Sequence, residues 1–315
     1  MLGKNKYSFT VLTPTFNRAK YLPPLFESLK AQTFKDFEWV IVDDGSIDET
    51  ESIVSGFKMI APFPIRYVWK KNGGKHTAIN LGASLAEGFF FAIMDDDDLY
   101  VPSALERFLY HWESIPAKKK NEFLGVCGLF KYDSGKIVGT QFPNDVLDTD
   151  DIELRIRYRV KGDKISVIRL DVMREFPFPE NLGRFVTESI VWNRMAQRYK
   201  TRFVNEVFAI KKYQPGGLTD QGRALRVYNC KSSRLSHYEL LSTHRKLPFD
   251  IAVRTYSNFI RYSLHEKIGW RGQVKEVPSK MFWLLCYPIG YGLAYRDRRL
   301  LRYLQNQGRE LEKEC

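Results

Sequence analysis

The sequence is poor in cysteine and histidine and has no long apolar run. Its 315 residues include four cysteines and five histidines, and no two cysteines form a CxxC pair. Neither a zinc site nor a disulfide framework is expected, and we interpret the cysteines as free thiols in a reducing compartment. The absence of 18 consecutive apolar residues excludes a clear membrane span. The short apolar run after the basic N-terminus lacks the cleavage site of a signal peptide.

Acidic residues are scarce in the second half of the chain. The net charge is +12, yet residues 1–150 carry 17 basic and 20 acidic residues, whereas residues 151–315 carry 32 basic and 17 acidic ones. The basic character therefore belongs to the second half, which suits nucleic acid, a membrane surface or an anionic substrate. The length and ordinary composition favour one large α/β domain or two smaller ones.

Strand-like and helix-like segments alternate through the first 120 residues. We expect strands at 7–13, 38–42, 65–69 and 89–94, and helices at 18–32, 48–60, 75–87 and 101–115. This alternation indicates a parallel sheet covered by helices on both faces. Ligands of such sheets lie beyond the carboxyl ends of the strands, where this chain has TPTFNR, DDGS, KKNGGK and DDDD.

The pattern changes after residue 120. We expect a hairpin at 123–139, helices at 148–159 and 188–199, and strands at 164–170 and 202–211. From about residue 222 onward the chain has the pattern of helices and loops, without repeats or low-complexity tracts.

Four consecutive aspartates, Asp95 to Asp98, follow the apolar run FFFAIM. Adjacent carboxylates at the end of a buried strand are costly unless a positive charge neutralises them. In an extended segment Asp95 and Asp97 would face one way and Asp96 and Asp98 the other. A D-x-D pair could then hold Mg²⁺, which one or two carboxylates and substrate phosphates usually bind. A simpler role, capping the next helix, explains Asp98 alone.

Two other strand ends carry candidate ligands and caps. We interpret Asp44, in VDDGS, as a ligand for a nucleobase imide or a ribose hydroxyl. Asp48 is expected to cap the helix that follows it, and Asn17 is expected to cap the first helix. NGGKH opens a helix with two glycines that let a phosphate approach the backbone, and Lys75 could pair with a diphosphate. The loop is neither a Walker A motif nor G-x-G-x-x-G. His76 has no partner in the sequence, so a catalytic role for it is the less favoured interpretation.

Together these motifs resemble the inverting family 2 glycosyltransferases of the GT-A fold, especially bacterial enzymes of surface-polysaccharide synthesis. The similarity rests on VLTPTFNRAKYLPPLFESLKAQTFKDFEWVIVDDGSIDET, then GGKHTAINLGASLAEG, then FFFAIMDDDDLYVPSAL. It covers residues 7–105 and weakens through residue 215. The resemblance implies an α/β fold with a mostly parallel nucleotide-binding sheet flanked by helices. It divides the chain into a nucleotide-sugar-binding half (1–120), an acceptor-binding half (121–220) and a basic, helical C-terminal region (221–315).

The resemblance also implies transfer of a sugar from a nucleotide-sugar donor, with UDP the expected nucleotide, to a saccharide acceptor. Asp44 would contact the nucleobase, Asp95 the ribose or metal region, and Asp97 would bind Mn²⁺ or Mg²⁺ that bridges the diphosphate. Asp96 stands where the family usually has a small or neutral residue, and its role, as support for a neighbouring ligand or as a spare acid, stays open. The residues expected to bind substrate are Thr13, Pro14, Thr15, Arg18, Asp44, Lys75, Asp95 and Asp96.

An inverting transfer needs a general base that deprotonates the acceptor hydroxyl. The family places an Asp or Glu at the start of a helix, some six residues before an Arg, and RFVTESIVWNR offers Glu188 with Arg194. From the residues alone, Glu188 is a first-turn glutamate that complements the helix dipole, with Thr187 as N-cap. The resemblance favours Glu188 as the base, and Asp163, in VKGDK, is the reserve candidate.

Residues 279–304 are the most apolar part of the C-terminal region. Residues 281–294 are too few to span a bilayer, and they are flanked by Lys280 and by Arg296, Arg298, Arg299 and Arg302. An apolar, aromatic patch edged by cations suits an interfacial membrane element, and a helix packed on the domain core suits the pattern equally. The lipid-linked acceptor that is common in the family favours contact with the inner face of the cytoplasmic membrane.

Three other functions fit parts of the pattern. A nucleotidyltransferase would carry a Gly-rich loop after the first strand, which TPTFNR lacks. A haloacid-dehalogenase-type phosphohydrolase would carry its D-x-D near the first strand rather than the fourth. A non-catalytic protein that binds nucleotide sugars or nucleic acid is the third, but an acidic pocket without a recognised module opposes nucleic acid, so none is expected as a partner. The sequence does not reveal the donor sugar, the acceptor, the linkage or the oligomeric state.

Overall fold

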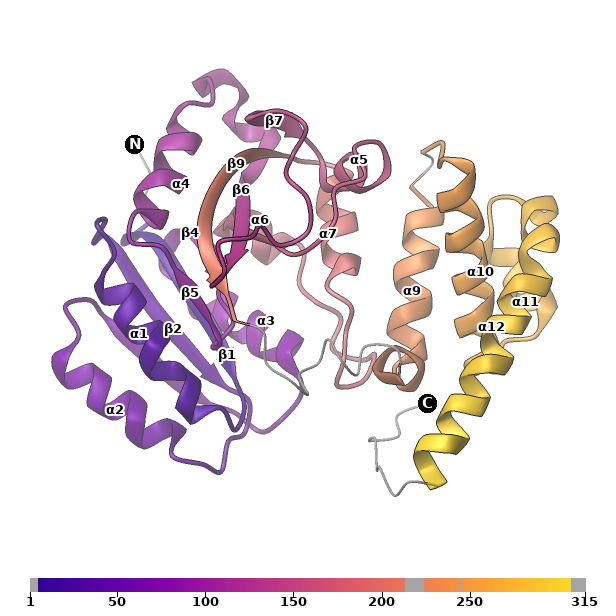
Figure 1. Ribbon diagram of the computed structural model, residues 1–315, viewed down its shortest axis with the longest axis horizontal. Helices are drawn as coiled ribbons and strands as arrows, with labels where there is room; N and C mark the ends of the chain where they lie inside the picture. The colour runs from indigo at the N-terminus through magenta and orange to yellow at the C-terminus, as the bar shows by residue number, and fades with distance from the viewer. Residues whose placement is uncertain (1–4, 213–223, 244, 307–315) are drawn as a thin grey trace. The chain divides into compact units, whose positions relative to one another are not determined.

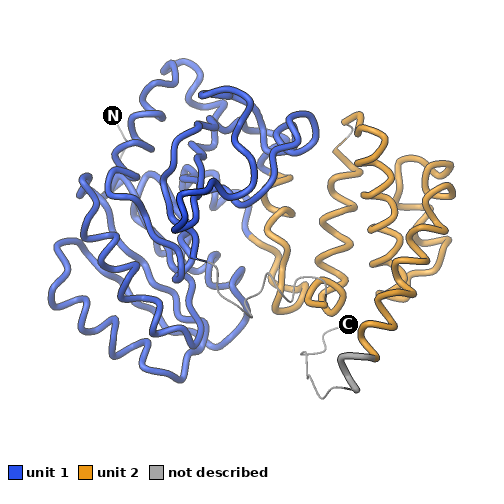
Figure 2. The backbone as a smooth tube through the Cα atoms, viewed as in Figure 1, with its two compact units in different colours: residues 1–177, 195–213 blue, residues 178–194, 214–315 orange. Residues whose placement is uncertain are grey.

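The computed structural model describes residues 5–212, 224–243 and 245–306. Its Cα positions group into two compact units (Figure 2), one made of Met1–Pro177 with Met195–Tyr213 and the other of Phe178–Arg194 with Gln214–Cys315. Among the described residues, every strand of the sheet belongs to the first unit, and the second unit consists of helices and loops.

The N-terminal part of the sheet is parallel. Its strands lie in the order β3-β2-β1-β4 and comprise β1 (Tyr7–Thr15), β2 (Phe37–Asp43), β3 (Ile65–Trp69) and β4 (Gly88–Ile93). All seven residues of β2 are buried. A strand with neighbours on both edges and helices on both faces requires such a continuous apolar run, and EWVIV supplies it.

Helices cover both faces of this parallel part (Figure 1). α1 (Leu22–Lys30) and α2 (Thr50–Ile60) pack on one face, where the rings of Phe26 and Phe57 stack on Trp39 of β2. α3 (Lys75–Leu85) covers the other face so closely that a Cβ atom at Gly82 would lie 2.3 Å from Leu12 of β1. The predicted parallel sheet with helices on both faces is confirmed.

Beyond β4 the sheet continues with mixed strand directions. β8 (Lys164–Arg169) is antiparallel to β4 and to β6 (Phe123–Tyr132), and β6 is parallel to β9 (Lys200–Lys211). Two short strands, β5 (Asp98–Tyr100) and β7 (Val146–Thr149), pair with β9 in the antiparallel direction. The helices of this part are α4 (Ala104–Glu113), α5 (Asp151–Ile156) and α6 (Leu170–Glu175), with a 3₁₀ turn η2 (Ala117–Glu122). Another 3₁₀ turn, η1 (Ala19–Tyr21), lies between β1 and α1.

Four local expectations are wrong. Asp48 is not the N-cap of α2, which is Glu49, and the carboxylate of Asp48 accepts hydrogen bonds from the amide of Ala19 and the hydroxyl of Thr50. Asn17 does not cap α1, because α1 begins at Leu22 after η1 and the Asn17 side chain instead accepts a hydrogen bond from the amide of Ile47 at 2.9 Å. Asp98 does not cap α4, whose N-cap is Ser103, because Asp98 is the first residue of β5. The hairpin predicted over 123–139 is reduced to a bridge between Lys131 and Ile137. In each case tertiary contacts decide the local structure.

The described part of the second unit is helical, as expected. α7 (Ser189–Ala196) begins in it, and α9 (Cys230–Leu241), α10 (Phe249–His265), α11 (Trp270–Glu276) and α12 (Lys280–Asn306) follow. α10 and α12 share a core that contains Phe259, Ile260 and Trp283. Over the described residues, no helix combines the length and the apolarity that crossing a membrane requires.

The cysteines agree only partly with the expectation of free thiols. Cys127 and Cys286 are buried and free, whereas Cys230 is disulfide-bonded. The expectation fails at Cys230 because scattered positions along a sequence do not show which residues meet in space.

A buried ion pair joins α10 to α12. Asp297, which has no exposed surface, accepts hydrogen bonds from Arg261 Nε at 2.5 Å and from a second Arg261 nitrogen at 2.8 Å. His265 Nε2 lies 3.2 Å from the same carboxylate. Removing one partner of such a pair leaves an uncompensated buried charge, whereas replacing both by apolar residues is often neutral.

We therefore expect Asp297→Ala to lower the free energy of unfolding of the second unit by about 3–5 kcal/mol. Hydrogen exchange of the backbone amides in α10 and α12 would measure the loss as faster exchange. Arg298→Ala, at an exposed position of the same helix, is the control and should exchange like the wild type. The double variant Arg261→Met with Asp297→Leu should recover most of the protection. Equal exchange in Asp297→Ala and Arg298→Ala would contradict the prediction.

Candidate functional site

The carboxyl ends of the four parallel strands bring the polar motifs together in the first unit. β1, β2 and β3 are paired so that Thr15 lies beside Asp43 and Asp43 beside Trp69. TPTFNR, DDGS, KKNGGK and DDDD then lie at one edge of the sheet, where hydrogen bonds and an ion pair connect them to one another. The convergence expected from the sequence is therefore present.

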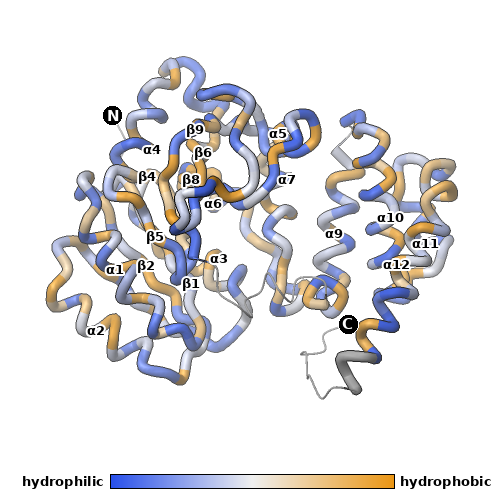
Figure 3. Tube along the Cα trace, in the orientation of Figure 1, coloured by the Kyte–Doolittle hydropathy of each residue, from blue (hydrophilic) through white to orange (hydrophobic). Residues whose placement is uncertain are grey.

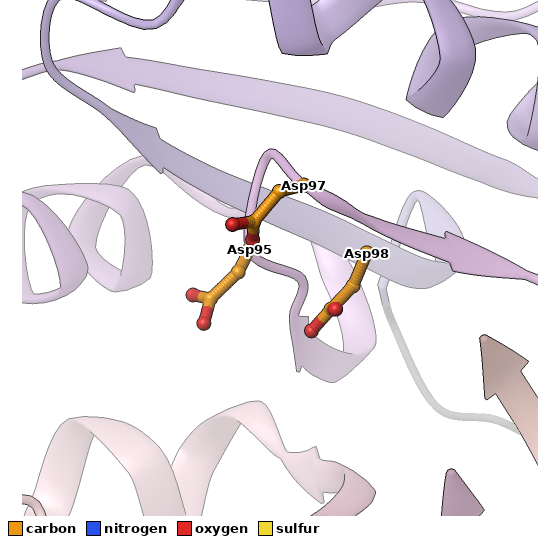
Figure 4. A group of neighbouring side chains, drawn as sticks. All are labelled: Asp95, Asp97 and Asp98. Carbon is orange, nitrogen blue, oxygen red and sulfur yellow. The ribbon is translucent and has the colours of Figure 1, made fainter. Parts of the chain in front are cut away.

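Three of the four consecutive aspartates gather their carboxylates (Figure 4). One oxygen atom from each of Asp95, Asp97 and Asp98, here called the aspartate cluster, lies within 4.8 Å of the other two. The chain turns at this point, since the amide of Asp98 donates to the carbonyl of Asp95 at 3.2 Å. The predicted alternation is wrong for that reason: Asp98 joins Asp95 and Asp97, and Asp96 does not.

Asp96 holds two residues that come from the end of β1. Its carboxylate is 4% exposed and accepts hydrogen bonds from Thr15 Oγ1 at 2.8 Å and from Arg18 Nε at 2.6 Å. A second nitrogen of Arg18 donates to Asp97. Burial raises the pKa of Asp96 to about 6, although Arg18 and Thr15 lower it. Asp96 thus anchors the guanidinium that contacts Asp97, while its predicted contact with substrate stays a prediction.

Two lysines complete the charge balance of the aspartate cluster. Lys75, the first residue of α3, places its Nζ 2.7 Å from Asp95, and Lys211, the last residue of β9, places its Nζ 3.2 Å from Asp98. Burial, together with repulsion from Asp95 and Asp97, raises the pKa of Asp98 to about 7 against the opposing effect of Lys211. Lys75 was expected near the site from its loop, whereas a lysine at a strand end carries no motif and Lys211 was missed.

The aspartate cluster has the donor set of a hard divalent cation. Mn²⁺ and Mg²⁺ prefer oxygen ligands, and three carboxylates supply them here. Asp98 is 2% exposed, and among the described residues its Oδ1 has no hydrogen-bond partner. A buried carboxylate oxygen without a partner calls for an explanation, and a cation ligand position provides one. The residues present therefore fit the metal that the sequence analysis expects.

Asp44 fixes the loop that precedes α3. Its carboxylate is buried and accepts hydrogen bonds from Lys70 Nζ at 2.7 Å and from the amides of Gly73 at 2.9 Å and Gly74 at 2.7 Å. Gly74 has a φ of 95°, which favours glycine. Asp44 thus joins the second and third strand ends into one polar surface, and Lys70 is a second residue that the sequence analysis missed.

The remaining residues predicted from the first strand and from α3 are buried. Thr13 has no exposed surface, and its hydroxyl accepts a hydrogen bond from Trp39 Nε1 at 3.0 Å, so its side chain supports the core. Pro14 is buried beside it, and His76 lies buried in α3. The predicted contacts of Thr13 and Pro14 with a nucleotide stay predictions.

The two candidates for the general base lie in different units. Glu188 belongs to the second unit, is half-buried, and directly precedes α7. Thr187 does not act as a side-chain cap, because its buried hydroxyl has no hydrogen-bond partner among the described residues. Arg194 binds Glu239 of α9 at 2.5 Å. Asp163, in the first unit, is exposed and lies 3.3 Å from Lys211. Both assignments stay predictions.

Comparison with known proteins bears on residues 10–137, which match the glycosyl transferase family 2 domain. An uncharacterized glycosyltransferase of Rickettsia bellii is 32% identical over 157 residues, which are 49% of this chain and 22% of that protein. The minor teichoic acid biosynthesis protein GgaB of Bacillus subtilis is 25% identical over 279 residues, 86% of this chain and 30% of GgaB. The chain thus spans about a third or less of the length of these curated relatives.

Solved structures share the fold. Residues 1–349 of S. aureus TarS in complex with UDP-GlcNAc superpose with a TM-score of 0.63 at 18% identity, covering 96% of this chain and 92% of that one. The mannosyltransferase PcManGT from Pyrobaculum calidifontis, in complex with GDP-Man and Mn²⁺, gives a TM-score of 0.57 at 15% identity, covering 93% and 88%. The expected α/β fold of the GT-A type is confirmed. Residues 10–137 of the chain are thus similar to the glycosyl transferase family 2 domain.

Proposed function

We propose that the chain is a metal-dependent, inverting glycosyltransferase that moves a sugar from a UDP-sugar to a saccharide acceptor in bacterial surface-polysaccharide synthesis. The observation that carries the proposal is the aspartate cluster, held between Arg18, Lys75 and Lys211 at the carboxyl edge of a family 2 domain. TarS with bound UDP-GlcNAc and the teichoic acid protein GgaB support the donor class and the pathway class.

The residues around the aspartate cluster suit a nucleoside diphosphate. Asp95, Asp97 and Asp98 would hold Mn²⁺ or Mg²⁺, which when bound would neutralise negative charge on the diphosphate leaving group. Lys75 at the N-terminus of α3 and Arg18 are cations within reach of the same charge. Asp44 and the loop that it fixes offer carboxylate and amide groups on the side where we place the nucleobase.

The transfer itself requires one displacement. The acceptor hydroxyl oxygen attacks the anomeric carbon from the face opposite the diphosphate, and the bond from that carbon to the phosphate oxygen breaks as the new glycosidic bond forms. Because the attack comes from the opposite face, the configuration at the anomeric carbon inverts, and Glu188 accepts the proton of the hydroxyl. The nucleoside diphosphate leaves with the charge that the cations of the site offset.

The alternatives predict different products. A nucleotidyltransferase would release pyrophosphate from a nucleoside triphosphate, and a non-catalytic binding protein would release nothing. A screen of UDP-, GDP- and dTDP-sugars with Mn²⁺ and Mg²⁺ separates these cases, because only a glycosyltransferase releases nucleoside diphosphate from a nucleotide sugar.

Asp97→Asn is expected to reduce metal-dependent release of nucleoside diphosphate by about 100-fold or more, because it removes a charged ligand from the metal. Turnover with the best donor of the screen would measure the loss. Asp133→Asn, at an exposed turn of the same unit, is the matched control and should retain activity. Full metal-dependent turnover by Asp97→Asn would exclude the aspartate cluster as the metal site.

Glu188→Gln is expected to reduce transfer by about 10²–10⁴-fold, the usual contribution of a general base. Because the substitution keeps the size of the side chain, donor binding should not change, and a binding titration beside the transfer assay would separate the two. Glu51→Gln, at an exposed first-turn position of α2, controls for loss of a helix-dipole interaction. Normal transfer by Glu188→Gln would exclude Glu188 as the general base and make Asp163 the next residue to test.

We further propose that α12 contacts an anionic membrane surface, consistent with a lipid-linked acceptor at the inner face of the cytoplasmic membrane. Its N-terminal part exposes Met281 by 83%, Leu284 by 67% and Leu285 by 60%. Pro288, Tyr291 and Tyr295 continue this exposed face at helical spacing. Exposed arginines follow at positions 296, 298, 299 and 302, and Figure 3 shows the hydrophilic colour of this part of the helix. Apolar side chains edged by cations favour an anionic interface.

The full chain is therefore expected to sediment with vesicles that contain phosphatidylglycerol, and less with vesicles of phosphatidylcholine alone. Leu284→Glu combined with Leu285→Glu should weaken the binding by at least about tenfold, because two apolar contacts with the interface are lost. Met59→Glu, at an exposed apolar position of α2, is the matched control and should bind as the wild type does. Equal binding by all three proteins would refute the contact.

A further inference from the structure

Lys211 faces the aspartate cluster from a separate strand. In the antiparallel pairing of β5 with β9, Asp98 lies directly opposite Lys211. Directly opposed residues of an antiparallel pair project from the same face of the sheet, and Lys211 Nζ lies 3.2 Å from Asp98 Oδ2. The backbone pairing therefore sets this contact. Asp163, 3.3 Å from the same nitrogen, holds the ammonium group from another side.

Lys211 contacts only one of the two carboxylate oxygens of Asp98. Lys211 contacts Oδ2, whereas Oδ1 is buried and has no hydrogen-bond partner among the residues that the structure describes. An oxygen of Asp98 also lies within 4.8 Å of oxygens of Asp95 and Asp97. Asp98 is thus placed to be a third metal ligand, and Lys211 is a counter-ion that would compete with the metal for the same carboxylate.

Three cations offset part of the negative charge of the cluster without a metal. Asp95 to Asp98 carry four negative charges when ionised, Asp163 adds a fifth beside Lys211, and Arg18, Lys75 and Lys211 supply three positive charges. A divalent cation that entered alone would compete with these cations for the carboxylates of a partly buried site, and the nearby positive charges oppose its binding. A divalent cation that arrives with a diphosphate brings anionic oxygens to which those ammonium groups bind.

We propose that the ammonium group of Lys211 occupies the position of a divalent cation at Asp98 when no metal is bound. When the metal binds, the ammonium group moves from Asp98 to the diphosphate of the donor. Asp98 then becomes the third carboxylate ligand, and metal and donor enter the site as one unit. That the diphosphate belongs to a nucleotide-sugar donor rests on the proposed function. By linkage, the nucleotide tightens metal binding by the same factor by which the metal tightens nucleotide binding.

Binding of Mn²⁺ alone to the full chain, followed by the electron paramagnetic resonance of free Mn²⁺, tests the competition without turnover. Lys211→Met is expected to tighten this binding by at least about tenfold, because a neighbouring unit charge shifts ionic equilibria on that scale. Lys211→Arg keeps the charge and should match the wild type. Lys136→Met, at an exposed lysine of the same unit, controls for the loss of one positive charge and should not change the affinity.

Two further measurements separate ligation by Asp98 from a general charge effect. The double variant Lys211→Met with Asp98→Asn should lose the gain in Mn²⁺ affinity, because an amide oxygen is a weaker ligand than a carboxylate. UDP should tighten Mn²⁺ binding strongly in the wild type and by a smaller factor in Lys211→Met, since the transfer of the lysine to the diphosphate is the source of the coupling.

Unchanged or weaker binding of Mn²⁺ alone by Lys211→Met, with the circular dichroism spectrum of the wild type, overturns the proposal. An equal gain in Lys136→Met, or a gain that survives Asp98→Asn, overturns it as well. If Mn²⁺ alone responds as expected but UDP, GDP and dTDP bind no variant, the competition between Lys211 and the metal stands and the proposed function fails.

Discussion

Repulsion between four adjacent carboxylates is the constraint on which the organisation of this site depends. Three cations from different elements compensate the four carboxylates: Arg18 after β1 contacts Asp96 and Asp97, Lys75 at the start of α3 contacts Asp95, and Lys211 at the end of β9 contacts Asp98. The run from Asp95 to Asp98 is stable only where these elements meet, so the fold is a condition for the site. The residual negative charge, in turn, makes the site a place for cations.

The two parts of the sheet contribute different components. The carboxyl ends of the parallel strands provide Arg18, Asp44 and the aspartates, which are the groups expected around a nucleotide. The mixed part provides Lys211 through β9 and, next to it, Asp163. A single sheet therefore joins the donor side of the domain to the side where we expect the acceptor. Under the proposed function, the mixed strands contribute to donor binding through Lys211, although they carry no recognisable motif.

The sequence was most informative where chemistry is local and least informative where it depends on pairing. Apolar runs located the parallel strands, and the position of DDDD after a strand located the aspartate cluster. The predicted orientation of Asp98 is wrong because a turn replaces the extended backbone. The predicted capping role of Asn17 is wrong because its hydrogen-bond partner lies in another loop. Lys211 could not have been found, since only the register of β5 with β9 places it opposite Asp98.

The contact between Lys211 and Asp98 also has a consequence for the order of folding. It closes a loop of 113 residues, and contacts so distant in sequence form after local structure, because the entropy of loop closure must be overcome first. A nascent chain that has emerged only through β5 already carries all four aspartates without the strand that supplies the third cation. Until β9 is added, the aspartates remain more hydrated and less compensated. Maturation of the site is therefore a late event, completed with the edge of the sheet.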